Sequence, residues 1–353
     1  MRVVMYGAAR SGRAVAERLD DVVLVDRTLG NEDDLSLLDG ADVLVKTPGV
    51  PGDRPLVAAA RERGIPVWSE VELGYRLLPD ARFVGVTGTN GKTTTTALLG
   101  EMFRAAGRDV AVAGNIGVPL TSVEHADWVV CELSSFQLED VDTFSCEVAV
   151  LLNLEPDHLD RYPSFEAYRD AKLRIFERAR AKVVPAGLGL DGIEFSADDE
   201  LPAEPLLRGA HNRENAAAAT AAARAAGIAD EHIAEGLRTF AGVAHRLELV
   251  AEIDGVRYVN DSKATNVAAA IKAIDAYDGE IVHLILGGSS KQEDFRPLAA
   301  AIGPRVRPVH FIGEEGPRMI ELIDGHIDGT LERAVEHARR LARPGEVVLL
   351  SPA

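Results

Sequence analysis

Short apolar runs alternate with amphipathic stretches through the first 80 residues. The run "RVVMYG" has the length of a buried strand, and "SGRAVAERL" after it has the apolar spacing of a helix. Three further runs of this kind follow: "DVVLVDR", "ADVLVKTPGV" and "IPVWSE". Such alternation is typical of parallel strands joined by helices. It predicts an α/β domain over residues 1–80, with a hinge at "LLPDAR".

The same alternation restarts twice further along the chain. Strand patterns in "RFVGVTG", "DWVVCELSS" and "CEVAVLLNL", a helix from Ser164 and an alanine-rich helix at 215–227 predict a second domain over 81–243. An apparent hairpin, "HRLELVAEIDGVRYVNDS", opens a third domain over 244–353. We therefore predict an α/β protein of three domains: N-terminal Rossmann-like, central P-loop-type mononucleotide-binding, and C-terminal Rossmann-like.

Composition narrows the classes of function. The chain has 353 residues, and its 38 basic and 56 acidic residues give a net charge of −18. This charge argues against sequence-independent nucleic-acid binding but leaves an anionic small substrate open, because a few placed cations dominate a cleft locally. No apolar run approaches the roughly 18–20 residues of a membrane span. With no signal-peptide pattern and only Cys131 and Cys146, we expect a cytoplasmic protein with buried thiols.

The stretch "VTGTNGKTTTT" (86–96) predicts a phosphate-binding loop of unusual spacing. The common template requires a glycine five residues before Gly91, where this chain has Val86; its glycine is Gly88. A strand precedes the loop and a helix follows, so backbone N–H groups and the helix N-terminus would surround an anion. Lys92 would pair with phosphate charge, and the Thr93 hydroxyl would reach Mg²⁺. The plainer interpretation is a threonine-rich helix start.

Lys172 lies in the centre of an apolar helix stripe. Phe165, Tyr168 and Ile175 share that face at helical spacing. One interpretation is a lysine that extends its charge to solvent. The other is a desolvated amine of lowered pKa, which CO₂ would convert to a carbamate ligand for Mg²⁺. His158 and Glu132 follow strands nearby in the pattern, at positions where α/β proteins carry functional groups.

The N-terminal turn "GAARSG" (7–12) is a weak dinucleotide-binding motif. Ala9 replaces the glycine that lets a pyrophosphate approach the backbone. A bare structural turn remains an equal alternative. A nicotinamide-dependent dehydrogenase would explain none of the motifs after residue 85.

Together these motifs resemble the Mur ligase family, ATP-dependent amide ligases of peptidoglycan precursor synthesis. The resemblance spans essentially the whole chain. "GTNGKTT" is shared with folylpolyglutamate synthases, whereas "SSFQLE" together with "NDSKATN" is much more specific to the branch that adds D-glutamate. The matching stretches are "GTNGKTT" (88–94), "GNIGVP" (114–119), "ELSSFQLE" (132–139), "DHLDRY" (157–162), "AKLRIF" (171–176), "HNRENA" (211–216), "HRLE" (245–248), "NDSKATN" (260–266) and "LGGSSK" (286–291).

The resemblance implies a reaction, its cofactors and its partners. The substrates would be UDP-N-acetylmuramoyl-L-alanine and D-glutamate, joined through an acyl phosphate and a tetrahedral intermediate at the expense of ATP. Two Mg²⁺ ions would assist, and the enzyme would be a monomer without nucleic-acid or membrane partners. Related ligases of other specificity, including folate polyglutamylation, and a binding protein that has lost turnover remain alternatives.

The resemblance also implies site residues. The catalytic residues would be Lys92, Glu132, His158 and Lys172, and the metal ligands Thr93, Glu132, His158 and carbamylated Lys172. ATP would be bound by Gly88, Thr89, Asn90, Gly91, Lys92, Thr93, Thr94, Asn215, Arg246 and Asp261. The UDP-substrate would be bound by Arg10, Ser11, Asp26, Arg27, Gly49, Asn115 and His158. D-Glutamate would be bound by Lys263, Thr265 and Lys291.

Two stretches depart from the family pattern. The chain stops at "EVVLLSPA", where the family continues into a loop and helix that help to bind D-glutamate. The stretch between Lys182 and Gly209 is also short for the family. We therefore expect a C-terminal domain that is incomplete at its end, and less certain activity than the central motifs imply.

Overall fold

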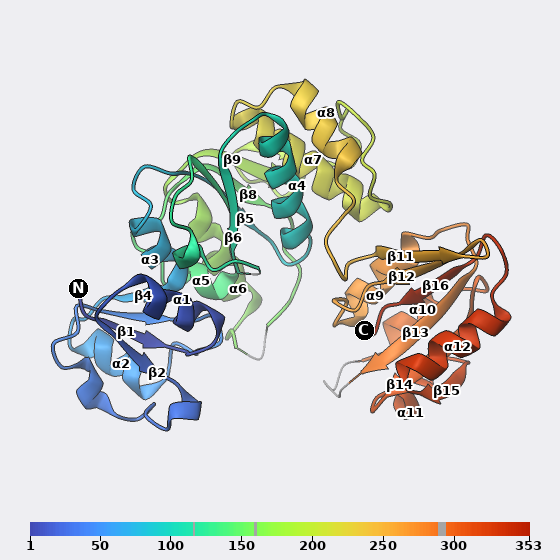
Figure 1. The fold of residues 1–353 in the computed structure, drawn as a ribbon, viewed down its shortest axis with the longest axis horizontal. Coiled ribbons are helices and arrows are strands. Elements are labelled where there is room, and N and C mark those ends of the chain that lie inside the picture. Colours follow the sequence, from blue (N-terminus) through green and yellow to red (C-terminus); the bar gives the residue numbers. More distant parts are fainter. Residues whose placement is uncertain (116, 159–160, 289–293) are drawn as a thin grey trace. The chain divides into compact units, whose positions relative to one another are not determined.

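A computed structural model describes residues 1–115, 117–158, 161–288 and 294–353 (Figure 1). The chain forms two compact units. Unit 1 contains residues 1–205 and 214–240, and unit 2 contains residues 206–213 and 241–353. Among the described residues, no helix is both long and apolar enough to cross a membrane.

The N-terminal part of unit 1 is a four-stranded parallel sheet of order β2-β1-β3-β4. β1 and β3 are fully buried because both faces of the sheet carry apolar side chains that are covered by helices. One face packs against α2, and the other packs against α1 and α3. The elements are β1 (Val3–Tyr6), α1 (Arg10–Arg18), β2 (Val22–Val25), β3 (Val43–Lys46), α2 (Pro55–Glu62), β4 (Val67–Ser69) and α3 (Glu70–Arg76).

The rest of unit 1 is built on a six-stranded parallel sheet of order β10-β9-β8-β5-β7-β6. Its strands are β5 (Arg82–Thr87), β6 (Val110–Gly114), β7 (Trp128–Glu132), β8 (Cys146–Leu151), β9 (Ala179–Pro185) and β10 (Ile193–Phe195). Its helices are α4 (Lys92–Ala105), α5 (Ser135–Leu138), α6 (Phe165–Leu173), α7 (Ala210–Ala225), which extends into it from residues of unit 2, and α8 (Asp230–Thr239). β5 lies between β7 and β8, so the carboxyl ends of these three strands meet at one edge.

Buried polar contacts join the two sheets of unit 1. The Lys46 ammonium lies 2.8 Å from Asp140 Oδ2, and both side chains are buried. Glu72 accepts hydrogen bonds from the backbone N–H groups of residues 142–144. Burial alone would raise the pKa of Glu72, but these bonds and that from the Thr143 hydroxyl lower it overall. Buried polar and charged side chains therefore fix the two sheets to one another.

Unit 2 contains a third sheet, of order β11-β12-β16-β13-β14-β15. β11 pairs antiparallel with β12 through a tight turn at Asp254 and Gly255, both of which have positive φ. This pairing confirms the predicted hairpin. The other strand pairs of the sheet are parallel. The strands are β11 (Glu248–Ile253), β12 (Val256–Asn260), β13 (Val282–Gly288), β14 (Val306–Gly313), β15 (His326–Gly329) and β16 (Val347–Leu350). The helices are α9 (Val267–Asp275), α10 (Arg296–Ala301), α11 (Gly316–Met319) and α12 (Leu331–Leu341).

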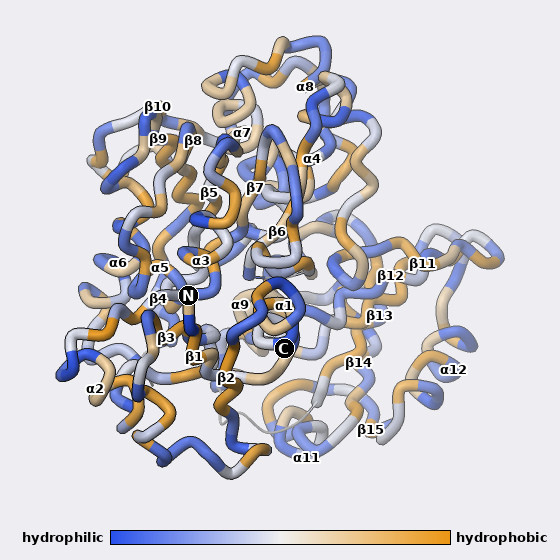
Figure 2. Tube along the Cα trace, turned by 60° about the vertical axis from the view of Figure 1, so that its left-hand side comes forward, coloured by the Kyte–Doolittle hydropathy of each residue, from blue (hydrophilic) through white to orange (hydrophobic). Residues whose placement is uncertain are grey.

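Helices cover both faces of this sheet. The core on one face includes residues of α9 and α10, and α12 packs on the other. Hydrophobic residues recur along the strands, and hydrophilic stretches occur in the connecting loops and along the helices (Figure 2). The predicted α/β class with three sheets is thus confirmed. The predicted boundaries at residues 80 and 243 stay predictions.

Two local expectations can be compared directly with the structure. Cys131 and Cys146 are free, buried thiols in β7 and β8, as expected. The helix from Ser164 is shorter than its apolar pattern suggested: it ends at Leu173, and a 3₁₀ turn covers Arg174–Phe176. The Arg174 guanidinium donates to the carbonyls of Glu139 and Val141 at this point, and Ile175 enters the core. Tertiary contacts therefore end the helix before its apolar pattern does.

Candidate active site

The phosphate-loop candidate connects the carboxyl end of β5 to α4. Gly88 and Gly91 have φ values of 153° and 85°. A Cβ atom at Gly88 would lie 2.9 Å from Leu152 Cβ, and one at Gly91 would lie 2.2 Å from Asn215 Oδ1. Both the backbone conformation and the lack of space therefore require glycine, and Asn215 lies against the loop.

Two lysines converge on this loop. Lys92 Nζ donates to the carbonyl oxygens of Gly88 and Thr89, at 2.8 and 2.7 Å. Lys172 Nζ, from α6, donates to the same Gly88 oxygen at 2.9 Å. Two amino groups and the N-terminus of α4 therefore surround one short turn, an arrangement suited to a polyanion.

Lys172 is only 2% exposed, which does not fit a lysine that extends its charge to solvent. Its Nζ lies 4.6 Å from the centroid of the Tyr168 ring. Burial, and to a smaller extent the charge of Lys92, lowers the pKa of Lys172 to about 6, and Asp157 acts against both. At neutral pH the Lys172 amine is therefore mostly neutral and nucleophilic.

Residues 153–155, directly after β8, hold the other side of the loop. Asn153 Oδ1 accepts from the backbone of Asn90 at 2.8 Å, and Glu155 Oε2 accepts from the Asn90 amide at 2.8 Å. The Thr89 hydroxyl lies 3.0 Å from the Tyr168 hydroxyl. The sequence analysis missed Asn153, Glu155 and Tyr168 as supports of the loop. Polar residues immediately after a predicted strand were the signal that could have found the first two.

Glu132 ends β7 beside the same loop. Its register partner in β5 is Val86, two residues before Gly88. Its carboxylate is buried and accepts from the Asn115 amide at 3.1 Å. Thr93 and Thr94 lie in the first turn of α4. Carboxylate and hydroxyl oxygens suit Mg²⁺, so Glu132 and Thr93 are of the right type to hold that ion.

His158 lies on the loop between β8 and α6. Its φ is 55°, and its side chain is 47% exposed. The imidazole centroid lies 4.9 Å from that of Phe136 and 6.3 Å from that of Tyr168. The ring is therefore accessible and lies close to the helix that carries Lys172.

The N-terminal turn brings together part of the predicted UDP site. Asp26 accepts from the backbone N–H groups of Ala8 and Thr28, at 2.8 and 2.9 Å, and these bonds lower its pKa. An ionised Asp26 therefore fixes the turn. Arg10 Nη1 donates to Gly117 O at 2.7 Å, which links the turn to the loop of Asn115. Ser11 lies in the first turn of α1; Arg27 and Gly49 are exposed.

Unit 2 has its own group of predicted site residues, at 246–265. Asp261 follows β12, and its buried carboxylate accepts from Ser351 Oγ at 3.0 Å and from the Leu247 N–H at 3.2 Å. Burial raises the pKa of Asp261 to about 6, against these hydrogen bonds and the charge of Arg246. Lys263 is partly exposed and Thr265 exposed. The sequence analysis missed Ser351, and Lys291 lies outside the described residues.

Family models match two parts of the chain. Residues 86–186 match the Mur ligase middle domain, and residues 245–353 match the Mur ligase glutamate ligase domain. A curated relative from Anaeromyxobacter dehalogenans, named UDP-N-acetylmuramoylalanine–D-glutamate ligase, is 42% identical over 100% of this chain and 92% of its own length. A relative of the same name from Acidobacterium capsulatum is 42% identical over 88% of this chain and 77% of its own length.

Solved structures agree in fold. The UDP-N-acetylmuramate-alanine ligase of Thermotoga maritima has a TM-score of 0.63 at 20% identity, over 99% of this chain and 95% of its own. The MurF protein of Acinetobacter baumannii has a TM-score of 0.62 at 19% identity, over 90% of this chain and 83% of its own. With sequence identity of about two in five across the full chain to curated relatives, this chain belongs to the Mur ligase family.

Proposed function

We propose that this protein uses ATP to form an amide bond between UDP-N-acetylmuramoyl-L-alanine and D-glutamate. The name carried by relatives that are 42% identical supports this choice of substrates. The observation that carries the chemistry is the glycine loop at the N-terminus of α4, where Lys92 Nζ donates to the Gly88 carbonyl at 2.8 Å. The buried Lys172 amine donates to the same carbonyl at 2.9 Å, in reach of the phosphates and neutral enough to react with CO₂. A site of this kind binds and polarises a nucleoside triphosphate.

The first step joins two anions. The alanine carboxylate attacks the γ-phosphorus of ATP, the bond from that phosphorus to the β–γ bridging oxygen breaks, and ADP leaves behind an acyl phosphate. Positioning and charge neutralisation supply most of the catalysis in such a transfer. Lys92 and the N–H groups of Gly91 and the first turn of α4 would hold the phosphates, and Asn215, packed on Gly91, would support the loop.

The second step forms the amide. The free amine of D-glutamate attacks the activated carbonyl carbon and gives a tetrahedral intermediate. The bond from carbon to the phosphate oxygen then breaks, inorganic phosphate leaves, and the nitrogen loses a proton. Arg246 and Asp261 would contact the nucleotide, and Lys263, Thr265 and Lys291 would bind the amino acid. The UDP portion would bind at Arg10, Ser11, Asp26, Arg27, Gly49 and Asn115.

Mg²⁺ fits the donors at the edge of the central sheet. Glu132 and Thr93 provide oxygen ligands for one ion. His158 and Lys172 would serve a second, provided that CO₂ has first converted the amine to a carbamate, because Mg²⁺ prefers oxygen ligands. When bound, Mg²⁺ neutralises negative charge on the phosphates. We further propose that the protein works in the cytoplasm, since both substrates are soluble small molecules, and that it is a monomer, as the resemblance to the family implies.

Amino-acid specificity tests the proposal. Phosphate release and product mass would be measured with Mg·ATP, UDP-N-acetylmuramoyl-L-alanine and one of D-glutamate, L-glutamate or diaminopimelate. The expected result is phosphate release that needs D-glutamate, with a product heavier by one glutamyl unit. A product with another amino acid would indicate a ligase of different specificity. Binding of ATP and the UDP-substrate without any product would contradict the proposed activity.

A further inference from the structure

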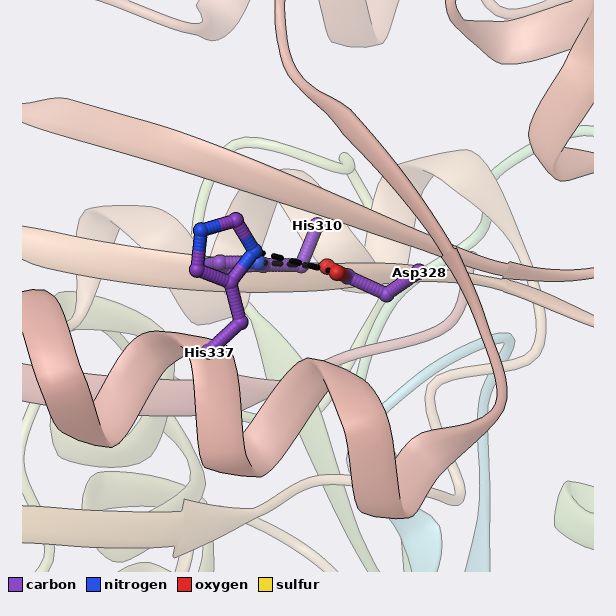
Figure 3. Close-up of side chains that lie close together, drawn as sticks. All are labelled: His310, Asp328 and His337. Atoms are coloured by element: carbon purple, nitrogen blue, oxygen red, sulfur yellow. Dashed lines mark hydrogen bonds and ion pairs between the residues drawn. The ribbon is translucent and has the colours of Figure 1, made fainter.

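Two histidines and an aspartate of unit 2 converge beside α12, in a group that contains none of the residues assigned above (Figure 3). His310 comes from β14, Asp328 from β15 and His337 from α12. His310 Nδ1 lies 2.7 Å from Asp328 Oδ2, and His337 Nδ1 lies 3.0 Å from Asp328 Oδ1. Three elements that are separate along the chain thus place a potential ligand atom each at one point.

The spacing of these atoms is close to that of a metal site. In a tetrahedral zinc site with ligands at about 2.0–2.1 Å, neighbouring ligand atoms are about 3.3 Å apart. The three ligand atoms all lie within 4.8 Å of one another. The two nitrogen–oxygen distances of 2.7 and 3.0 Å are thus a few tenths of an ångström shorter than in such a site.

Burial separates this group from ordinary surface side chains. His310 is 0% exposed, and neither Asp328 nor His337 is fully exposed. The Nδ1 atoms of both histidines face the one carboxylate of Asp328, so the three polar groups are directed at each other rather than at solvent.

We propose that His310, Asp328 and His337 form a zinc site that joins β14, β15 and α12. Two imidazole nitrogens and one carboxylate suit Zn²⁺, whereas Mg²⁺ prefers oxygen ligands. His326, at the exposed start of β15, has its ring centroid 4.8 Å from that of His337 and 6.1 Å from that of His310. His326 also lines a cavity of about 550 Å³, which His310, Asp328 and His337 do not line.

The role we assign to this ion is structural. Its ligands join two neighbouring strands to the helix that covers them, and none of the residues proposed to bind substrate takes part. A second group, Asp109, His125 and Asp127 of unit 1, has a similar composition but is exposed at all three positions. It therefore provides a matched control for zinc binding by surface side chains.

The test is zinc titration of the full chain, freed of metal by a chelator and desalted, without ATP. Calorimetry would compare the unchanged chain with His337→Gln, Asp328→Asn and the control His125→Gln. We expect one Zn²⁺ per chain, at least tenfold weaker binding in His337→Gln and Asp328→Asn, and unchanged binding in His125→Gln. Circular dichroism would establish that each variant is folded. If His337→Gln does not fold, Asp328→Asn still tests the site, because it keeps the shape of the side chain.

Cobalt gives a readout that needs no variant. Co²⁺ bound to the unchanged chain should show the intense visible absorption of a tetrahedral nitrogen and oxygen site, and Zn²⁺ should displace it. A purely structural hydrogen-bond network would give no such band. The proposal is overturned if no saturable one-to-one binding occurs, if Co²⁺ shows only octahedral absorption, or if His125→Gln alone abolishes binding.

Discussion

The environment of Lys172 determines its chemistry. The side chain lies in an apolar helix face, is 2% exposed and donates to the Gly88 carbonyl. Burial and the nearby Lys92 bring its pKa to about 6. An amine that is neutral near pH 7 reacts with CO₂, whereas an ordinary surface lysine is almost entirely protonated at that pH. The buried position is therefore an argument for chemistry at this residue.

We predict that Lys172 is carbamylated in the active protein. With ¹³C-labelled bicarbonate, the unchanged chain should show a carbamate carbon resonance that is missing in Lys172→Gln. The same variant should lose ligase turnover by about 10²–10³-fold, the usual effect of removing one group that stabilises charge in a transition state. An unchanged carbon spectrum with full activity in Lys172→Gln would refute this role.

Asp261 should make the stability of unit 2 depend on pH. Its folded pKa, raised from 3.8 to about 6 mainly by burial, lies above that of the unfolded chain. Between these values the folded state binds more protons, so the free energy of unfolding falls as pH rises from about 4 to about 6. At about 1.4 kcal/mol per pKa unit, the loss is roughly 3 kcal/mol.

Urea unfolding at pH 4–8 measures this effect. Asp261→Asn removes the ionisable group while keeping the size of the side chain. The difference in unfolding free energy between the variant and the unchanged chain should therefore grow in favour of the variant up to about pH 6 and then level off. A difference that is constant over the whole range would mean that Asp261 does not titrate in this window.

At the scale of elements, the loop between β5 and α4 depends on one glycine conformation. Gly91 has φ 85°, and a Cβ atom there would meet Asn215 Oδ1 at 2.2 Å. Gly107, after the other end of α4, has φ 68° but open space around it. Alanine at Gly107 would add backbone strain only, whereas alanine at Gly91 would add the same strain and also displace Asn215. Comparing the two variants therefore separates these two contributions to the loss of stability.

Gly91→Ala should lower stability and ATP affinity together. Strain alone costs about 1–2 kcal/mol for a residue with a Cβ in this region, and Gly107→Ala should show that cost only. Gly91→Ala should in addition raise the Kd for ATP at least tenfold, because Asn215 must move and the loop with it. Calorimetric ATP binding and urea unfolding would measure both variants. Equal ATP affinity in the two would refute the account of the loop.

The sequence predicted local elements well and their ends less well. Apolar alternation was sufficient for the strands of the N-terminal sheet and for β5, β7 and β8, but it did not predict β6, β9, β10 or β15. The glycine-rich spacing was sufficient for the turn between β5 and α4. The sequence pattern did not indicate that Arg174 would end α6 by donating to the carbonyls of Glu139 and Val141. Likewise, the supports Asn153 and Glu155 are about 65 residues from the loop they hold, and Ser351 is 90 residues from Asp261. Such contacts depend on strand order, which periodicity does not contain.

At the scale of the molecule, the first two sheets form one compact unit, although the pattern along the chain indicates two separate α/β segments. The ion pair of Lys46 with Asp140 is part of the reason, since it joins residues 94 positions apart in a site without solvent. Arg61 lies 3.1 Å from the other oxygen of Asp140 and is half exposed. Removing one member of a buried pair leaves the other without compensation.

Lys46→Met should destabilise unit 1 by about 3 kcal/mol, because Asp140 stays buried and keeps only Arg61. The matched control is Arg63→Ala, which breaks the exposed pair with Asp39 and should cost less than about 1 kcal/mol. Urea unfolding would measure both changes. If the two variants lose equal stability, the buried pair does not fix the sheets.

The most direct test of the account follows the oxygen atoms of the substrate. The alanine carboxylate of UDP-N-acetylmuramoyl-L-alanine would be labelled with ¹⁸O, and turnover would be run with Mg·ATP and D-glutamate. If the chain forms an acyl phosphate and then the amide, each phosphate released carries one ¹⁸O atom and the amide retains the other. Unlabelled phosphate would mean that water attacks ATP, and would contradict the proposed ligase.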